Sequence, residues 1–234
     1  MNIRHRIAAA VATVGLAATG LALVAPAAQA APLPQAAAKT CKIEGFTPGS
    51  VTLGLTPKKV KFAPKTSGCT VTSWSISTSS FQATNKNPYV TLTAKSAPAK
   101  VQDVVVQVTA SNGQTKEATF IDGLHLVAPA QFNTRTQAGP EPATKGKKMN
   151  VAGQLVVVSY KQNGWTSFVG QPLKVQFKAK GGKYKTIKTV KTGEYGYVQT
   201  TVTAKKSGTW RMTYAGTSTA TSATAKGDYV KVTK

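Results

Sequence analysis

Apolar residues alternate with polar ones over four stretches in the C-terminal half of the chain. The alternating positions are Met149, Val151, Leu155 and Val157; Leu173, Val175, Phe177 and Ala179; Val198, Val202 and Ala204; and Trp210, Met212 and Tyr214. A period of two is typical of β-strands, whose successive side chains point to opposite faces. Glycines that permit tight turns separate the stretches. The pattern predicts an antiparallel β-sandwich with these side chains in its core, completed by strands over residues 184–190 and 228–232.

The N-terminal half shows shorter stretches of the same kind. Strands are predicted over residues 42–44, 51–55, 59–63, 70–76, 89–94, 101–110 and 114–121, with turns rich in proline, glycine and asparagine between them. Asn112-Gly113 is the strongest turn signal, because this pair favours a tight hairpin. The hairpin should bring two sets of apolar side chains to one core face: Val104, Val106 and Val108 before the turn, Ala118 and Phe120 after it.

Three prolines mark a boundary between the two halves: Pro129, Pro140 and Pro142. Proline cannot donate a hydrogen bond to a β-ladder, so residues 129–143 are predicted to form a linker, although residues 131–136 could also be a first edge strand of the second domain. The predicted domains are residues 41–128 and 144–234, a size that suits two small domains. The predicted fold class is all-β, with two antiparallel sandwiches in tandem.

Residues 1–30 show the three regions of a secretory signal peptide: a basic start with Arg4 and Arg6, an apolar middle, and small residues ending at Ala30. A membrane anchor is the alternative, but glycines, threonines and Pro26 interrupt the apolar run. The mature protein is expected outside the cell or non-covalently at the envelope, without a membrane span after cleavage. Residues 31–40 have too little apolar bulk to pack and are predicted to be a disordered leader.

Cys41 and Cys69 are the two cysteines of the chain. Both follow the signal peptide, and an oxidising compartment favours a disulfide between them. A two-cysteine metal site is the alternative, but it needs further ligands that the single mature histidine hardly supplies. Free thiols are the third possibility. Of these three possibilities, export favours the disulfide. It would join an N-terminal strand to an inner strand.

Lysine dominates the surface chemistry. The formal net charge of +23 falls by two, to +21, when Arg4 and Arg6 leave with the signal peptide. Lys174, Lys178 and Lys180 alternate with apolar residues and are predicted to share an outer face, with Lys185 and Lys188 following in the next strand. The plain explanation is solubility and protection of sheet edges. The functional one is contact with an anionic polymer; scarce arginine and export disfavour nucleic acid as that partner.

No strong catalytic or metal-binding pattern is present in the sequence. His125 is the single mature histidine, and the only carboxylate near it in sequence is Asp122. The acidic residues are scattered singly, which disfavours both a glycosidase pair and a calcium site. The sequence therefore predicts a protein that is not an enzyme and holds no metal or cofactor.

Aromatic residues near predicted loops are candidates for a stacking platform. They are Trp165, Tyr184, Tyr195 and Tyr197. Rings beside lysines can stack on sugars or bases. The alternative is that Tyr195 and Tyr197 simply cap a hairpin.

The last ninety residues or so contain a recognisable series of short motifs. They are Val151-Ala152-Gly153-Gln154-Leu155, Trp165, the segment Gly170 to Phe177, Lys188-Thr189-Val190-Lys191-Thr192, Gly196, the segment Gly208 to Gly216 with its Trp210-Arg211 pair, and Ala225 to Val232. This order resembles a bacterial immunoglobulin-like module that recurs in secreted proteins of Streptomyces-type actinobacteria. The resemblance implies an immunoglobulin-like sandwich and an extracellular location, but no catalytic or binding residues.

The N-terminal half resembles an immunoglobulin-like sandwich less closely, because Trp74 follows Cys69 instead of lying between the two cysteines. The function expected from the sequence is non-catalytic: binding or structure at the envelope or in the extracellular matrix, with the lysine face on an anionic cell-wall polymer. The alternatives are a secreted effector or inhibitor that contacts an extracellular protein, and an accessory carbohydrate-binding module.

Overall fold

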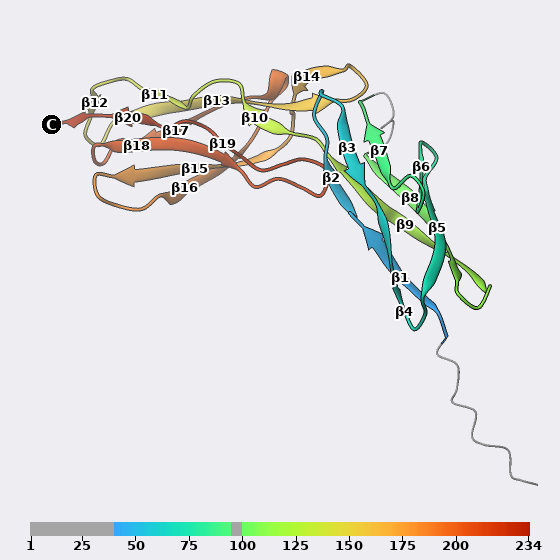
Figure 1. Cartoon of the computed structure of the whole chain (residues 1–234). Helices are drawn as coiled ribbons and strands as arrows, with labels where there is room; N and C mark the ends of the chain where they lie inside the picture. The colour runs from blue at the N-terminus through green and yellow to red at the C-terminus, as the bar shows by residue number, and fades with distance from the viewer. Residues whose placement is uncertain (1–39, 95–99) are drawn as a thin grey trace, which may run out of the picture. The chain divides into compact units, whose positions relative to one another are not determined.

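The computed structural model describes residues 40–94 and 100–234, and nearly all regular secondary structure in them is β-strand (Figure 1). In that part of the chain the one helical element is a short 3-10 turn, η1 (Glu194–Gly196). The predicted signal peptide, and all of the predicted leader except Thr40, lie outside the described residues. The strands pack as β-sandwiches of the immunoglobulin-like type, which confirms the predicted all-β fold, whereas the count of two tandem domains stays a prediction.

Among the described residues, the first sandwich contains nine strands. They are β1 (Lys42–Thr47), β2 (Ser50–Thr52), β3 (Lys58–Lys61), β4 (Ala63–Ser67), β5 (Val71–Ser77), β6 (Gln82–Thr84), β7 (Tyr89–Leu92), β8 (Val101–Ala110) and β9 (Thr115–Val127). Five of them form a sheet in the order β2-β9-β8-β5-β6, and β1-β4 and β3-β7 form two-stranded ladders. Strands β4 and β6 were not predicted, because each is short and lacks an alternating apolar pattern.

The β8–β9 hairpin has the predicted core face. Val106 pairs with Ala118 and Val104 with Phe120, and both valines are fully buried. The turn is wider than the Asn-Gly pair suggests, since Ala110 N–H donates to the carbonyl of Gln114 and leaves a three-residue loop. Gly113 takes the positive φ of 80° that closes such a loop.

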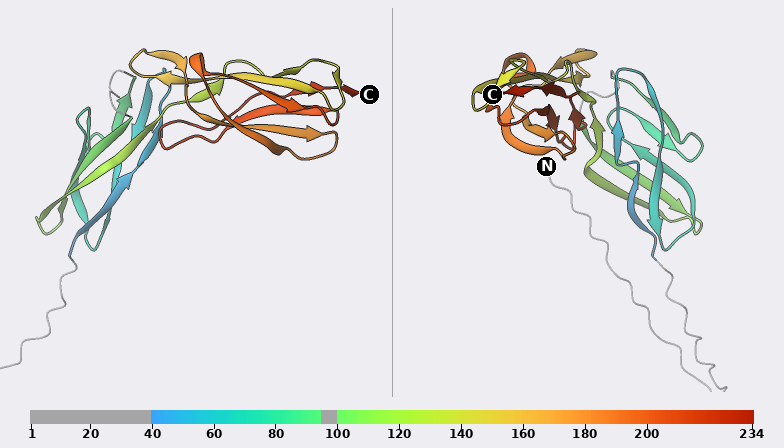
Figure 2. Two further views of the ribbon diagram at one scale, coloured as in Figure 1. Left: turned by 180° about the vertical axis from the view of Figure 1, so that it is seen from behind. Right: turned by 90° about the vertical axis from the view of Figure 1, so that its left-hand side faces the viewer.

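The second sandwich contains the remaining strands. They are β10 (Ala130–Phe132), β11 (Gln137–Gly139), β12 (Ala143–Thr144), β13 (Lys148–Ser159), β14 (Gly164–Ser167), β15 (Pro172–Ala179), β16 (Lys185–Lys191), β17 (Tyr197–Thr203), β18 (Gly208–Tyr214), β19 (Ala223–Thr224), β20 (Asp228–Val230) and β21 (Val232–Thr233). One layer, the β13 sheet, joins β10, β11, β14 and β17 to β13; the other, the β15 sheet, has the order β16-β15-β18-β19 with β20 also on β18. Figure 2 shows these layers from two further directions.

The sequence predicted a linker over the proline-bearing segment 129–143, but the structure shows that this segment is part of the second sandwich. It contains β10, β11 and β12; β10 and β11 pair with the two halves of β13, and β14 and β17 pair with the same halves from the opposite edge. Between them, Thr136 is fully buried and its hydroxyl accepts a hydrogen bond from Met212 N–H at 3.1 Å. The second sandwich therefore begins before Thr144. The division of the chain into two domains stays a prediction.

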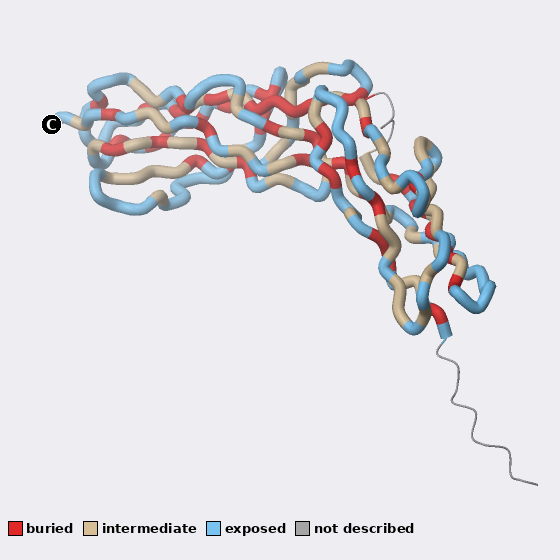
Figure 3. Tube along the Cα trace, viewed as in Figure 1, coloured by how far each residue is buried: buried red, intermediate tan, exposed pale blue. Residues whose placement is uncertain are grey.

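The core of the second sandwich matches the alternating pattern. Most of the predicted positions on β13, β15, β17 and β18 are buried, whereas Phe177 and Ala179 are only partly so. Figure 3 shows buried positions of these strands in red, interspersed with intermediate positions in tan and exposed ones in pale blue. Close approach of the two layers is visible at Gly153, where an added Cβ would lie 3.1 Å from the sulfur of Met212.

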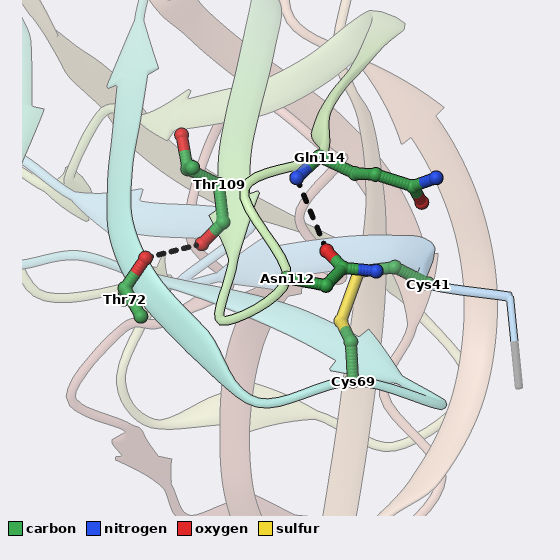
Figure 4. The surroundings of a disulfide bond; sticks show 6 residues. All are labelled: Cys41, Cys69, Thr72, Thr109, Asn112 and Gln114. Carbon is green, nitrogen blue, oxygen red and sulfur yellow. Dashed lines mark hydrogen bonds between the residues drawn. A yellow bond between two sulfur atoms is a disulfide. The ribbon is translucent and has the colours of Figure 1, made fainter. Parts of the chain in front are cut away.

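The disulfide between Cys41 and Cys69 is present, with the Cα atoms 4.9 Å apart. Cys41 precedes β1, and Cys69 lies in the turn that leads from β4 into the inner strand β5. The bond therefore closes the end of the β1–β4 ladder, where Lys42 pairs with Ser67. Figure 4 shows it beside the β8–β9 loop, in which Asn112 Oδ1 accepts a hydrogen bond from Gln114 N–H at 3.1 Å.

Tyr160 links the two sandwiches through its hydroxyl, which donates a hydrogen bond to the carbonyl of Leu53 at 2.9 Å. The side chain is buried, and this burial raises the pKa of Tyr160 to about 12 because it disfavours the phenolate.

This burial predicts an alkaline loss of stability. The neutral phenol is favoured in the folded protein, so the contribution of Tyr160 is fully present below the ordinary tyrosine pKa of about 10 and is lost as the pH rises through about 12. The free energy of unfolding should fall by about 2 kcal/mol from this group over that interval. Urea unfolding between pH 9 and 12 measures this decrease in the free energy of unfolding. The Tyr160→Phe variant should lack the part of the decrease that comes from Tyr160. An unchanged slope in the variant would contradict the assignment.

Candidate functional site

The outer face of the β15 sheet gathers cations from three strands. Lys174 and Lys178 project outward from β15, because the residues that alternate with them, Leu173, Val175 and Phe177, pack in or against the core. Their partners in register also project outward: Lys174 pairs with Thr213, and Lys178 with Thr209. Arg211, opposite Gln176, and Lys191, opposite Pro172, complete the set. We call Lys174, Lys178, Lys191 and Arg211 the cationic face.

Arg211 is held in place on this face. Its Nε donates to Gln176 Oε1 at 2.9 Å, and its guanidinium carbon lies 3.6 Å from the centre of the Tyr184 ring. Lys178 Nζ lies 5.0 Å from the same ring centre. Such cation–π contacts orient the cations without neutralising them.

The cationic face has no acidic counterpart among its own strands. The one Asp or Glu on β15, β16, β18 and β20 is Asp228, and its register partner is the inward-facing Trp210. Asp228 pairs with Arg135 at 3.5 Å and accepts a hydrogen bond from Ala138 N–H. Within residues 40–94 and 100–234, this is the one ion pair closer than 4 Å. The positive charge of the face is therefore available to a ligand.

Three of the candidate polyanion-binding lysines lie outside this face, and one of them, Lys180, was predicted to share it. Lys180 is in the turn after β15. Lys185 and Lys188 share the opposite side of the sheet, because their partners are Phe177 and Val175. A bulge in β16 puts both lysines on that side, although three positions separate them. Lys188 Nζ reaches across to β17 and donates to Thr200 Oγ1 at 2.7 Å.

The aromatic candidates divide into two groups. Tyr184 belongs to the cationic face and is half-buried, with its ring contacted by Arg211, so it is not an open stacking surface. Trp165, Tyr195 and Tyr197 lie on the outer face of the β13 sheet and are 43%, 70% and 55% exposed. Trp165 pairs with Val158 and Tyr197 with Gln154, whose side-chain amide donates to the Tyr195 carbonyl at 2.9 Å.

Gly196 holds the two exposed tyrosines in their turn. Its φ is +70°, and a Cβ there would collide with the carbonyl of Leu155, so only glycine fits. The turn thereby places Tyr195 directly before the start of β17, two positions from Tyr197.

His125 is the single histidine of the described residues. It lies on β9, opposite Ser50 of β2 and Val101 of β8, and its Nδ1 is buried without a hydrogen bond in the described structure. Among the described residues, no three His, Cys, Asp or Glu side chains group as a metal site requires. In the same residues, no helix has the length and apolar character of a membrane span.

Sequence reasoning missed Arg211 and Lys191 as members of the cationic face. The alternation of Trp210, Met212 and Tyr214 was sufficient to place Arg211 outward. It could not show that β18 lies next to β15, since 35 positions separate Arg211 from its partner Gln176.

No protein-family profile matches the chain, and no curated protein matches it in sequence. Among solved structures, the chain is similar to the fibronectin type III-like modules of Clostridium thermocellum CbhA, at 11% identity over 82% of this chain and 93% of that chain, with a TM-score of 0.39. It is also similar to murine CEACAM1b, at 10% identity over 83% and 100%, with a TM-score of 0.43. The D00-D0 domain of Intimin matches at 12% identity over 80% and 98%, with a TM-score of 0.28. At these values the likeness concerns the β-sandwich fold alone.

Proposed function

We propose that this is a secreted, non-catalytic binding protein of the cell envelope or extracellular matrix, and that its cationic face contacts an anionic polymer. The observation that carries the proposal is the un-neutralised set of four cations on the outer face of the β15 sheet. An origin in a Streptomyces-type actinobacterium, with cell-wall polymers as the ligand, is part of the proposal.

The chemistry around the cations suits an extended polymer. Thr209 and Thr213 project outward between the cationic side chains, and Gln176 holds Arg211. Hydroxyl groups can bond phosphate or sugar oxygens while the cations supply attraction over a longer range. A sheet face offers these groups along a flat surface instead of enclosing one small molecule, which favours a chain with repeated negative charge.

The proposal predicts strongly salt-dependent binding to a polyphosphate such as purified teichoic acid. If the four cations displace counterions as proteins do on nucleic acids, affinity should fall about 50-fold or more between 50 and 200 mM salt. Replacing three of them, with Lys174→Gln, Lys178→Gln and Lys191→Gln, should weaken binding and flatten the salt dependence. Retention on immobilised polymer across a salt series measures both effects.

The matched control removes three lysines of the first sandwich: Lys65→Gln, Lys86→Gln and Lys116→Gln. All three are exposed, and in the described structure none of their side chains makes a hydrogen bond, an ion pair or a cation–π contact. The control variant has the same net charge as the test variant, so it separates the cationic face from overall charge. Equal weakening by the two variants, or no binding by the wild type at 50 mM salt, would contradict the proposal.

A carbohydrate-binding function is the second candidate, and the exposed rings of the β13 sheet favour it. Trp165 and Tyr197 are opposite Val158 and Gln154, four positions apart on β13, which corresponds to about 13 Å along a strand. Rings at that separation would contact different sugars of one chain. Weaker retention of a neutral polysaccharide by Trp165→Ala and Tyr197→Ala, with teichoic acid binding unchanged, would support this candidate over the first.

A further inference from the structure

A pocket lies between the two layers of the second sandwich, at the edge where β16 and β17 face each other. Its volume is about 420 Å³. Each of these strands pairs on one side only, β16 with β15 and β17 with β13, so the sandwich is open between them. Lys188 bridges the opening through its 2.7 Å bond to Thr200. The pocket is therefore formed by the sandwich edge and is separate from the cationic face.

The lining combines an apolar floor with a basic rim. Phe177 and Trp210 form the floor, with ring centres 4.8 Å apart, and Val202 and Ile187 extend it toward β17 and β16. Lys188, Lys205 and Lys206 are the charged residues of the lining, and no acidic residue belongs to it. Ile187 is 50% exposed. It is an apolar side chain exposed to water on a strand, β16, whose other residues are mostly lysine and threonine.

Trp210 and Val202 are core residues of two different strands, and the pocket gives access to them. A volume of this size lies within the range of small-molecule sites, about 300–1,000 Å³. An apolar group placed on the rings would remove apolar surface from water, and a terminal anion would meet the lysine ammonium groups. Charge complementarity excludes a cationic ligand, and the ring floor disfavours a purely hydrophilic anion.

We infer that this pocket binds a small amphiphilic anion, a free carboxylate with an apolar chain, whose chain lies on Phe177 and Trp210 and whose carboxylate meets Lys205 and Lys206. The ligand is a single soluble molecule and not a polymer. Its site differs from the cationic face in residues, in side of the sheet and in the chemistry it recognises.

Sodium octanoate is the probe for this site, titrated by calorimetry and by tryptophan fluorescence, since Trp210 lines the pocket whereas Trp74 and Trp165 do not. The wild type should bind one octanoate saturably, and octan-1-ol and acetate should each bind at least about tenfold more weakly. Lys205→Gln with Lys206→Gln should weaken octanoate binding about tenfold and leave octan-1-ol binding unchanged. Ile187→Ser should weaken both ligands.

The matched control is Lys65→Gln with Lys86→Gln, which removes the same charge from the first sandwich and should bind octanoate like the wild type. The inference is overturned if octanoate does not saturate, if octan-1-ol binds as tightly, or if the Lys205 and Lys206 variant equals the control. Octanoate should not compete with teichoic acid, so loss of polymer binding and loss of octanoate binding are separate outcomes. Competition between the two ligands would also count against two distinct sites.

Discussion

A fragment of residues 128–234 should unfold in one cooperative transition, whereas a fragment of residues 144–234 should be largely unfolded or aggregated. The shorter fragment lacks β10 and β11, which leaves one edge of β13 unpaired. It also lacks buried Thr136, whose hydroxyl satisfies Met212 N–H. Each lost hydrogen bond in a buried setting costs about 1 kcal/mol, and several together approach the whole stability of a small domain. Circular dichroism and urea unfolding of both fragments measure the difference.

The same pair of fragments tests whether the second sandwich needs the first. In the fragment of residues 128–234, the first sandwich is absent and Leu53 no longer covers the Tyr160 hydroxyl, so the burial that raises the pKa of Tyr160 should lessen and the pKa should move back toward the ordinary tyrosine value. A cooperative transition with that shift would mean that the second half folds by itself and merely contacts the first. Failure of both fragments would instead mean that the two halves share one core.

Removing the disulfide should lower the free energy of unfolding by about 3 to 4 kcal/mol. Cys41 and Cys69 are 28 positions apart, and the bond restricts that loop in the unfolded chain. The test is urea unfolding of the Cys41→Ala, Cys69→Ala double variant against the wild type. A loss of this size is a large share of the stability expected for a small domain, so the variant should unfold at clearly lower urea.

Reduction of the wild type with dithiothreitol provides the control for this substitution. The reduced protein should be two hydrogen atoms heavier and should unfold close to the double variant, because both lack the same constraint. Equal stability of the oxidised and reduced proteins would contradict the expected contribution. A double variant much less stable than the reduced wild type would show that packing of buried Cys41 matters more than the bond.

The two proposed sites belong to opposite sides of one sheet, and neighbouring strands supply both. On β15, Lys174 and Lys178 project outward to the cationic face, whereas Phe177 projects inward to the pocket. On β18, Arg211 and Trp210 divide in the same way. Substitutions can therefore alter one site while leaving the other side of the sheet intact.

The sequence by itself determined the fold class, most core positions and the cysteine pair. These depend on local properties: a period of two decides which side chains can share a face, and glycine and proline mark the turns. Val151, Leu173 and Met212 were predicted in the core and are fully buried. The cysteines are a pair because no third one exists in the chain.

Only the tertiary structure decided which charged residues lie together. Lys185 and Lys188 are on the pocket side because a bulge in β16 interrupts the alternation, and a bulge depends on the register with the neighbouring strand. Arg211 joins Lys174 and Lys178 because β18 pairs with β15, a contact between residues far apart in sequence. Segment 129–143 forms edge strands because β13 has unpaired backbone groups along that edge, and the sequence raised an edge strand only as an alternative, over residues 131–136, because it could not show where the partner strand lies.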